Sequence, residues 1–225
     1  MKPRHLKAPF LWQERRPCIQ DGILYVPNYY FEHELFSANC WRKFLGNNVS
    51  IACELCSGNG DWVVAQAKQN PETHWIAVEQ RFDRVRKIWS KMTNYHIHNL
   101  RIVCGTAQTF FRYYVPSTAL EHIVVNFPDP WPKSRHHKHR LFQPAFVQEI
   151  FRVLQDSAVL ALATDHRGYL EEAIEVIKIN LMPVIKTPHY QKIIGNYGES
   201  WFEKLWREKG EEIFYTEFVK KLGYS

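Results

Sequence analysis

The residues best suited to chemistry lie between Asn126 and Arg140, in the segment N-F-P-D-P-W-P-K-S-R-H-H-K-H-R. A single carboxylate, Asp129, stands between two prolines, each of which fixes its own φ and lacks a backbone donor. We therefore expect Asp129 on a stiff turn, with the flat ring of Trp131 close behind it. An acid on a rigid turn beside an aromatic ring suits the binding of a nucleic-acid base. The plain alternative is a proline-rich surface turn.

A dense cationic run follows this turn. Its members are Lys133, Arg135, Lys138 and Arg140, with His136, His137 and His139 between them. Such a run would neutralise the phosphates of a polyanion, or it would simply be a solvated charged segment. The formal net charge of the chain, +6, favours an anionic partner.

A glycine-rich turn joins two predicted strands earlier in the chain. The apolar run 49–56 carries one charge, Glu54, and the turn S-G-N-G-D at 57–61 opens a helix over 62–69. The turn contains Gly58 and Gly60, which would let a ligand approach the backbone closely.

The next predicted strand, 74–79, ends in Glu79, 25 positions after Glu54. A carboxylate at that spacing and at a strand end can accept hydrogen bonds from two ribose hydroxyls. The match to G-x-G-x-x-G is poor, which disfavours a dinucleotide, and an acid before the turn favours a ligand with a cationic group. Alternatively, Glu54 caps the following helix.

Strands and helices alternate through most of the chain, which predicts an α/β fold with a mostly parallel, doubly wound sheet. We expect helices over 31–45, 82–93, 144–154 and 169–178, a short helix after Thr106, and strands over 100–104, 122–127, 157–164 and 183–186. The alternating segment 212–220 suits a strand at a sheet edge, and the basic helix 82–93 is interpreted as a solvated face.

Polar residues stand at the ends of several of these strands. Ligands of open parallel sheets bind outside the carboxyl ends of the strands. The residues expected to converge there are Glu54, Glu79, Thr106, Asp129 and Asp165.

Length and composition bound the remaining possibilities. At 225 residues with 45% hydrophobic content, the chain is expected to form one domain over 1–225, with 1–20 as a loosely ordered basic arm. No apolar run would span a membrane, and no secretory core is present, so a cytoplasmic protein is expected. Five cysteines without framework spacing suit a reducing compartment, and the lone C-x-x-C of Cys53 and Cys56 does not predict a metal site.

These motifs together resemble the tRNA (guanine-N7-)-methyltransferase family, from about Phe44 to Lys220, and F-P-D-P-W-P-K followed by R-H-H-K-H-R is highly specific to it. The resemblance implies a Rossmann-like fold of S-adenosylmethionine-dependent methyltransferases with an antiparallel C-terminal strand. It also implies methylation of a guanine in the variable loop of tRNA, guanine 46 in the family. A monomer or homodimer without an obligatory protein partner is expected.

The resemblance also assigns roles to residues. Asp129 matches the active-site aspartate and borders the cofactor, whose other contacts would be Glu54, Gly58, Gly60, Glu79 and Thr106. The positions implied for RNA are Lys133, Arg135, His136, His137, Lys138, His139, Arg140, Asp165, Ser200, Trp201, Phe202 and Glu203.

The chain departs from the family pattern at three places. Cys56 replaces the first glycine of E-x-G-x-G-x-G, Thr106 replaces an aspartate near the adenine, and Ser200 to Glu203 lacks a basic residue. Two other functions remain as alternatives. One is an amino-group methyltransferase, since D-P-P-W-like turns serve that chemistry, although P-D-P-W followed by R-H-H-K-H-R disfavours it. The other is a catalytically silent RNA-binding subunit, which Cys56 and Thr106 leave open.

Methylation at guanine N7 needs no general base, because that nitrogen carries a lone pair and no proton. Catalysis would rest on alignment and on negative charge near the purine, which becomes cationic. Asp129 could accept hydrogen bonds from guanine N1–H and the amino group, while Trp131 or Phe202 stacks on the base. Adenine has no matching pair of donors.

Overall fold

The computed structural model describes residues 1–10, 16–28, 30, 32–33, 44–45, 50–192 and 201–221, without the side chains of Trp201 and Phe202. Its contacts divide the chain into two compact units, Met1–Pro116 and Ser117–Ser225. Most of the helix expected over 31–45 lies outside the described residues. A single domain stays a prediction.

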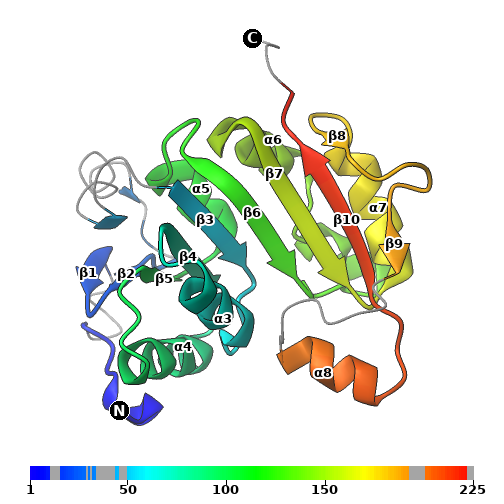
Figure 1. Cartoon of the computed structure of the whole chain (residues 1–225). Helices are drawn as coiled ribbons and strands as arrows, with labels where there is room; N and C mark the ends of the chain where they lie inside the picture. Colours follow the sequence, from blue (N-terminus) through cyan, green and yellow to red (C-terminus); the bar gives the residue numbers. More distant parts are fainter. Residues whose placement is uncertain are drawn as a thin grey trace. The chain divides into compact units, whose positions relative to one another are not determined.

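The first unit is built on a mostly parallel set of strands (Figure 1). Its elements are η1 (Pro3–His5), β1 (Cys18–Gln20), β2 (Ile23–Tyr25), β3 (Ser50–Leu55), α3 (Asp61–Gln69), β4 (Thr73–Glu79), α4 (Phe82–Asn94), β5 (Leu100–Cys104) and α5 (Ala107–Tyr114). Strands β2, β5, β4 and β3 pair in parallel in that order, and β1 adds to β2 in the antiparallel sense. Helix α3 packs against β4 and beside α4.

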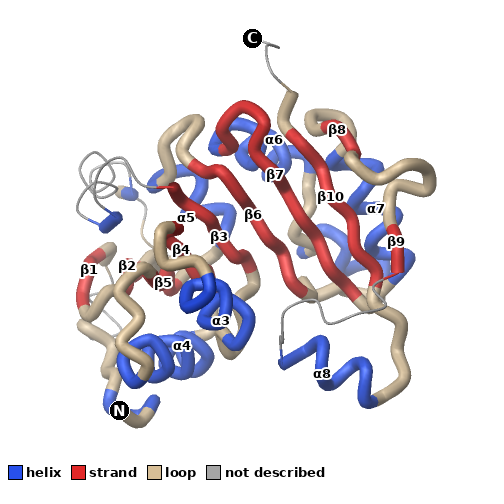
Figure 2. The backbone as a smooth tube through the Cα atoms, in the orientation of Figure 1, coloured by secondary structure: helices blue, strands red, loops and turns tan. Residues whose placement is uncertain are grey.

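The second unit combines parallel and antiparallel pairs, and Figure 2 shows its strands in red beside blue helices. Its elements are β6 (Leu120–Asn126), η3 (Ser134–His139), α6 (Pro144–Val153), β7 (Leu154–Thr164), α7 (Arg167–Ile177), β8 (Met182–Pro183), β9 (Gln191–Lys192), α8 (Trp201–Glu208) and β10 (Phe214–Val219). Strand β6 runs parallel to β7, whereas β10 is antiparallel to β7. The mostly parallel fold with an antiparallel C-terminal strand is confirmed.

Two expectations about the edges need correction. Strand β10 is not at an edge, because its outer side pairs with the two-residue strands β8 and β9. Of the strand expected over 183–186, only Pro183 belongs to a ladder, as the second residue of β8, although the Val184 N–H still donates to the Glu217 carbonyl at 2.9 Å.

The N-terminal residues are attached more firmly than an arm would be. Leu6 is 2% exposed, and its carbonyl accepts from Arg86 Nε at 3.0 Å. The Met1 carbonyl accepts from Ser90 Oγ at 2.7 Å and from Asn94 Nδ2 at 2.9 Å. The loose arm is therefore wrong for residues 1–6, and residues 18–20 form β1; the sequence lacked a periodicity that would have predicted this docking onto α4.

Candidate functional site

Three of the expected site residues meet at one edge of the first unit. Glu54 lies opposite Ala77 in the parallel register of β3 and β4, and Glu79 lies opposite Cys104 in that of β4 and β5. Thr106 follows β5 directly. Parallel strands bring their carboxyl ends to the same edge, so the two buried acids and Thr106 share it.

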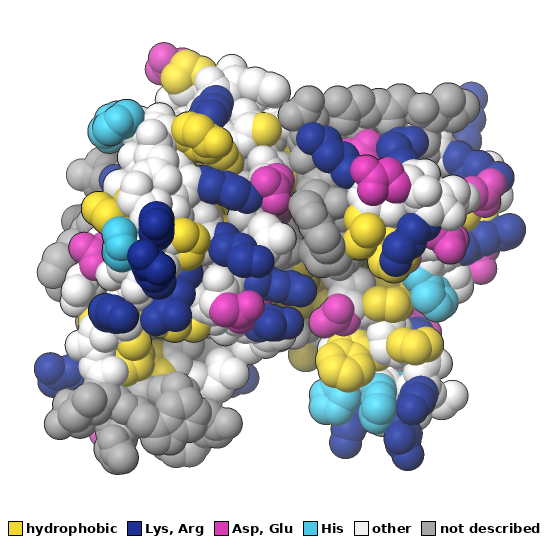
Figure 3. Space-filling model, turned by 90° about the horizontal axis from the view of Figure 1, so that it is seen from below, with side chains coloured by type: hydrophobic (Ala, Val, Ile, Leu, Met, Phe, Trp, Pro, Cys, Tyr) yellow, Lys and Arg dark blue, Asp and Glu magenta, His cyan; other side chains and the backbone are white. Residues whose placement is uncertain are grey.

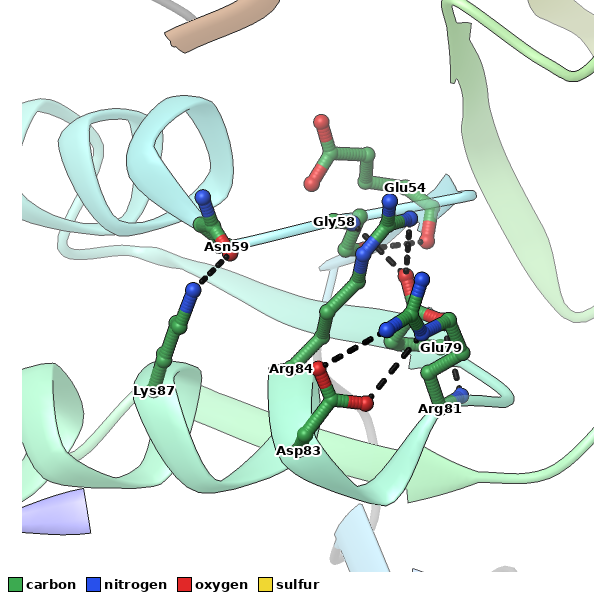
Figure 4. A network of polar contacts seen from close by, with 9 residues as sticks. Glu54, Gly58, Asn59, Glu79, Arg81, Asp83, Arg84 and Lys87 are labelled. Atoms are coloured by element: carbon green, nitrogen blue, oxygen red, sulfur yellow. Dashed lines mark hydrogen bonds and ion pairs between the residues drawn. The ribbon is translucent and has the colours of Figure 1, made fainter.

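Glu79 organises the polar contacts at this edge (Figure 4). Its side chain is 4% exposed, and its carboxylate accepts from the Gly58 N–H at 2.9 Å and from the Arg81 N–H at 2.8 Å. Arg84 Nη1 lies 3.6 Å from Glu79 Oε2. Burial raises the pKa of Glu79, while these donors and the Arg84 charge act in the opposite direction. A carboxylate has about four acceptor sites, so it has room for further donors.

The glycine turn has a left-handed backbone at three positions. Residues Cys56, Gly58 and Gly60 have φ values of +61°, +55° and +77°. A Cβ on Gly60 would lie 2.7 Å from Ile88 Cγ1, so this glycine lets α4 pack closely against the start of α3. A glycine is therefore required at position 60 by packing, whereas Gly58 donates its N–H to the Glu79 carboxylate.

Helix α4 ties down the same turn with its cations. Lys91 Nζ donates to the Asn59 carbonyl at 2.8 Å and to Asp61 Oδ1 at 2.6 Å. Lys87 Nζ donates to Asn59 Oδ1 at 3.1 Å. The interpretation of this helix as a solvated face is wrong for Lys91, which is only partly exposed and pairs with the turn, but it holds for Lys87, which is exposed.

Thr106 uses its hydroxyl within the protein. It caps α5, accepting from the Thr109 N–H at 3.3 Å and donating to Thr109 Oγ1 at 2.9 Å. An N-cap serine or threonine satisfies backbone donors of the first helical turn. The hydroxyl is thus engaged in capping, and adenine contact by Thr106 stays a prediction.

The cysteines of the C-x-x-C differ in environment. Cys53 is fully buried, and its burial, with Glu54 next to it, raises the pKa of its thiol well above the usual value. Cys56 is partly exposed. Within the described residues, no three His, Cys, Asp or Glu side chains gather as a metal site.

In the second unit, Asp129 and Asp165 follow neighbouring parallel strands. Asn126 lies opposite Ala163 in the register, and the Phe127 N–H donates to the Ala163 carbonyl at 2.9 Å. Asp129 is exposed and Asp165 half-buried, and burial together with the Glu211 charge raises the pKa of Asp165. These two acids therefore share one edge of the unit.

The cationic run forms the 3₁₀ helix η3, whose members face different environments. Lys133, Arg135 and Lys138 are exposed. The rings of His136 and His139 lie 5.7 Å and 5.4 Å from that of Trp131, centroid to centroid. His137 Nδ1 is 3.9 Å from Glu172 Oε2.

Arg140 requires a correction, because it is only 5% exposed and cannot present its charge to a polyanion in this arrangement. Its guanidinium donates to the Pro130 carbonyl at 2.8 Å and pairs with Glu172 on α7. The position of Arg140 at the end of a charged run could not indicate its burial, because its partner Glu172 is 32 residues further along the chain.

The positions expected in the C-terminal part of the site give a mixed result. Ser200 lies outside the described residues. Trp201 and Phe202 open α8, and Glu203 is 2% exposed with its carboxylate 3.0 Å from Arg207 Nε. Contact of Glu203 with RNA stays a prediction.

Sequence reasoning also missed Arg84 and Glu172. Arg84 stands five residues after Glu79, a spacing that could have suggested a return from the first turn of the helix to the strand end. Glu172 had no local signal, because it meets Arg140 only through the packing of α7.

The fold and the turn define the class. The sheet is open and mostly parallel, a glycine turn follows its first long parallel strand, β3, and a buried acid ends the next strand. These features together are those of a class I S-adenosylmethionine-dependent methyltransferase. The two buried carboxylates fit this cofactor, because Glu79 and Glu54 can accept hydrogen bonds from ribose hydroxyls and can oppose the charge of a cationic ligand. No helix among the described residues is long and apolar enough to cross a membrane.

Comparisons with known proteins agree. A family model described as "Putative methyltransferase" matches residues 48–216. The tRNA (guanine-N(7)-)-methyltransferase of Chlamydia pneumoniae is 68% identical over 99% of this chain and all of its own length. That of Leptospira interrogans is 30% identical over 89% of this chain and 93% of its own. The chain belongs to the tRNA (guanine-N7-)-methyltransferase family.

Solved structures resemble the chain in fold alone. A 16S rRNA methyltransferase superposes with a TM-score of 0.60 at 13% identity, covering 82% of this chain and 94% of that one. The 16S rRNA (adenine(1408)-N(1))-methyltransferase of Catenulisporales acidiphilia, solved with its cosubstrate SAM, gives a TM-score of 0.57 at 14% identity, covering 82% and 92%.

Proposed function

We propose that this protein methylates N7 of a guanine in tRNA, and that the guanine lies in the variable loop, at position 46. The observation that carries the proposal is the similarity over nearly the whole chain to the Chlamydia pneumoniae protein, which is named for that reaction. S-adenosylmethionine, when bound, supplies a methyl group on a cationic sulfonium.

Asp129 is proposed as the catalytic residue. It is exposed at the carboxyl end of β6 on a turn between two prolines, so its carboxylate is available to a ligand yet restricted in position. Accepting from guanine N1–H and the amino group would leave N7 facing the methyl group and would oppose the charge that develops on the purine. The exposed ring of Trp131 is proposed to stack on the base.

The other assignments follow from exposure and charge. Lys133, Arg135 and Lys138 are proposed to contact phosphates, and Glu79 to bind the ribose of the cofactor through the acceptor sites that Gly58 and Arg81 leave. Figure 3 shows many Lys and Arg side chains, in dark blue, on the surface of each unit. Such a surface supports a polyanionic substrate.

The test is transfer of a labelled methyl group to unmodified tRNA, followed by nucleoside analysis. We expect 7-methylguanosine, and cleavage of the modified RNA at that base should map it to the variable loop. Label in an exocyclic amino group would favour the alternative methyltransferase, and tRNA binding without transfer would favour the silent subunit. A 7-methylguanosine elsewhere in the tRNA would refute the position alone.

The first prediction concerns Asp129. Asp129→Ala should lower the methylation rate about 10²–10³-fold, the effect of losing one preorganised electrostatic group. The melting temperature and most tRNA affinity should remain, since phosphate contacts supply the affinity. Asp129→Asn should also be poor, because the amide lacks the charge.

Asp156→Ala is the matched control, because Asp156 is also exposed and in the second unit, but near the amino end of β7. Its rate should equal that of the unsubstituted protein. Near-normal guanine N7 methylation by Asp129→Ala would disprove the proposed role, even with the family assignment intact.

A further inference from the structure

Arg140 is the cation of the segment Lys133–Arg140 that the fold withdraws from solvent. Its side chain is 6% exposed, whereas Lys133, Arg135 and Lys138 are classed as exposed. A guanidinium removed from water must have partners that repay its desolvation. The identity of those partners indicates what Arg140 does.

The partners are the backbone carbonyls next to Asp129. Arg140 Nε donates to the Pro130 carbonyl at 2.8 Å, and Nη2 lies 3.5 Å from the Trp131 carbonyl. The guanidinium therefore contacts the two residues that immediately follow the carboxylate proposed for catalysis.

The guanidinium is itself fixed from α7. Nη1 donates to Glu172 Oε2, and Cζ lies 5.5 Å from the centroid of the Tyr169 ring. Arginine suits this place because its planar fork presents several donors in fixed directions, which the single ammonium of lysine cannot do.

The turn needs such support. Pro128 and Pro130 have no N–H, so neither can donate a backbone hydrogen bond to hold the turn. Phe127 and Trp131 have φ values of +49° and +44°, a backbone conformation that costs free energy for residues with a Cβ and persists only where surrounding contacts impose it. Donation to the carbonyls supplies this constraint from the acceptor side.

We propose that Arg140 is a positioning residue for methyl transfer, which orients Asp129 by holding the Pro130 and Trp131 carbonyls, and that Glu172 orients Arg140. The inference rests on the role proposed for Asp129. It replaces the expectation that Arg140 binds phosphate.

The test compares steady-state kinetics of Arg140→Lys, Glu172→Ala and Lys138→Ala. Arg140→Lys keeps the charge but loses the fork, so kcat should fall about 10- to 100-fold, the scale of misplacing a reacting group by about 1 Å. Its KM for tRNA and the salt dependence of binding should not change. Glu172→Ala should lower kcat in the same way by a smaller factor, and Lys138→Ala, the exposed control, should raise KM and leave kcat alone.

A double substitution separates positioning from a general structural defect. If Arg140 acts through Asp129, adding Arg140→Lys to Asp129→Ala should lower kcat less than about 3-fold further, because the group being positioned is already absent. Equal losses in both backgrounds would overturn the proposal.

Other outcomes are also decisive. A raised KM and a flatter salt dependence for Arg140→Lys, with kcat unchanged, would make Arg140 a phosphate contact. Tighter tRNA binding by Glu172→Ala at unchanged kcat would also make Arg140 a phosphate contact. If Arg140→Lys fails to fold, the kcat and tRNA affinity of Glu172→Ala decide between the two roles. Loss of activity in Asp129→Ala with full activity in Arg140→Lys would refute positioning alone, whereas full activity in both would refute the role of Asp129.

Discussion

Cys56 occupies a backbone position that usually belongs to glycine. Its φ of +61° lies in the left-handed region, and it is the residue that replaces the first glycine of the family turn. The chain therefore keeps the shape of the turn with a side chain that disfavours it. A left-handed residue with a Cβ costs about 1–2 kcal/mol, whereas glycine costs about 0.5–1 kcal/mol in lost chain entropy.

We expect Cys56→Gly to raise the free energy of unfolding by about 0.5–1 kcal/mol, the difference between these two costs. Urea unfolding measures it. Cys56→Ala is the control, because alanine keeps the Cβ and hence the strain. An equal gain in both variants would attribute the effect to the thiol instead of the backbone.

At the scale of elements, the contact between α4 and the glycine turn holds this turn of the first unit in place. Gly60 precedes α3 at a φ of +77°, and an added Cβ would lie within 2.7–3.2 Å of three atoms of Ile88. The Lys91 contacts to Asn59 and Asp61 close the same interface from the polar side. The turn that carries Gly58 is thus fixed by a helix that does not itself carry Glu54 or Glu79.

We predict that Gly60→Ala lowers the free energy of unfolding by about 2–4 kcal/mol, because left-handed strain and overpacking against Ile88 add. Gly210→Ala separates the two, since Gly210 has a φ of +76° with no atom near its added Cβ. It should cost about 0.5–1 kcal/mol, the strain less the chain entropy that replacing a glycine recovers. Similar losses in the two variants would show that Ile88 yields without cost.

The elements themselves were largely predictable from local pattern. The strand–turn–helix–strand order from β3 to β4 follows from apolar runs separated by a glycine turn, and β3, α3 and β4 begin and end within a residue or two of the predicted bounds. Strands β8 and β9 have two residues each, too few for any periodicity to indicate.

The candidate site follows the same rule: local features could be predicted from the sequence, and contacts between distant residues could not. Asp129 and Glu79 could be predicted as site residues from the sequence, because proline spacing and a strand end are local signals, and their roles stay predictions. The burial of Arg140 was not, because its cause is Glu172, which lies 32 residues away. The capping by Thr106 was not predicted, although a threonine directly before a helix is a common N-cap.

The whole molecule carries a formal net charge of +6, and its exposed cations set how binding responds to salt. Replacing Lys133, Arg135 and Lys138 together with alanine should weaken binding to different tRNAs alike. The slope of log K against log salt should flatten by about 0.7 per lost phosphate contact, as for a single strand. Lys178→Ala, an exposed lysine paired with Glu175 at 2.6 Å, is the control and should leave the slope unchanged. An unaltered slope in the triple variant would mean that the segment is merely solvated.

The antiparallel pair of β7 and β10 has a consequence for synthesis. Thr164 pairs with Phe214, 50 positions later, and Val159 pairs with Val219, 60 positions later. At about 5–20 residues per second, a ribosome would make this partner strand roughly 3–12 s after β7 itself. For that interval β7 presents an open row of backbone donors and acceptors on the side that β10 later covers, which is the kind of edge that invites pairing with another chain. The nascent protein is therefore most exposed to misassembly just before its last strand is complete.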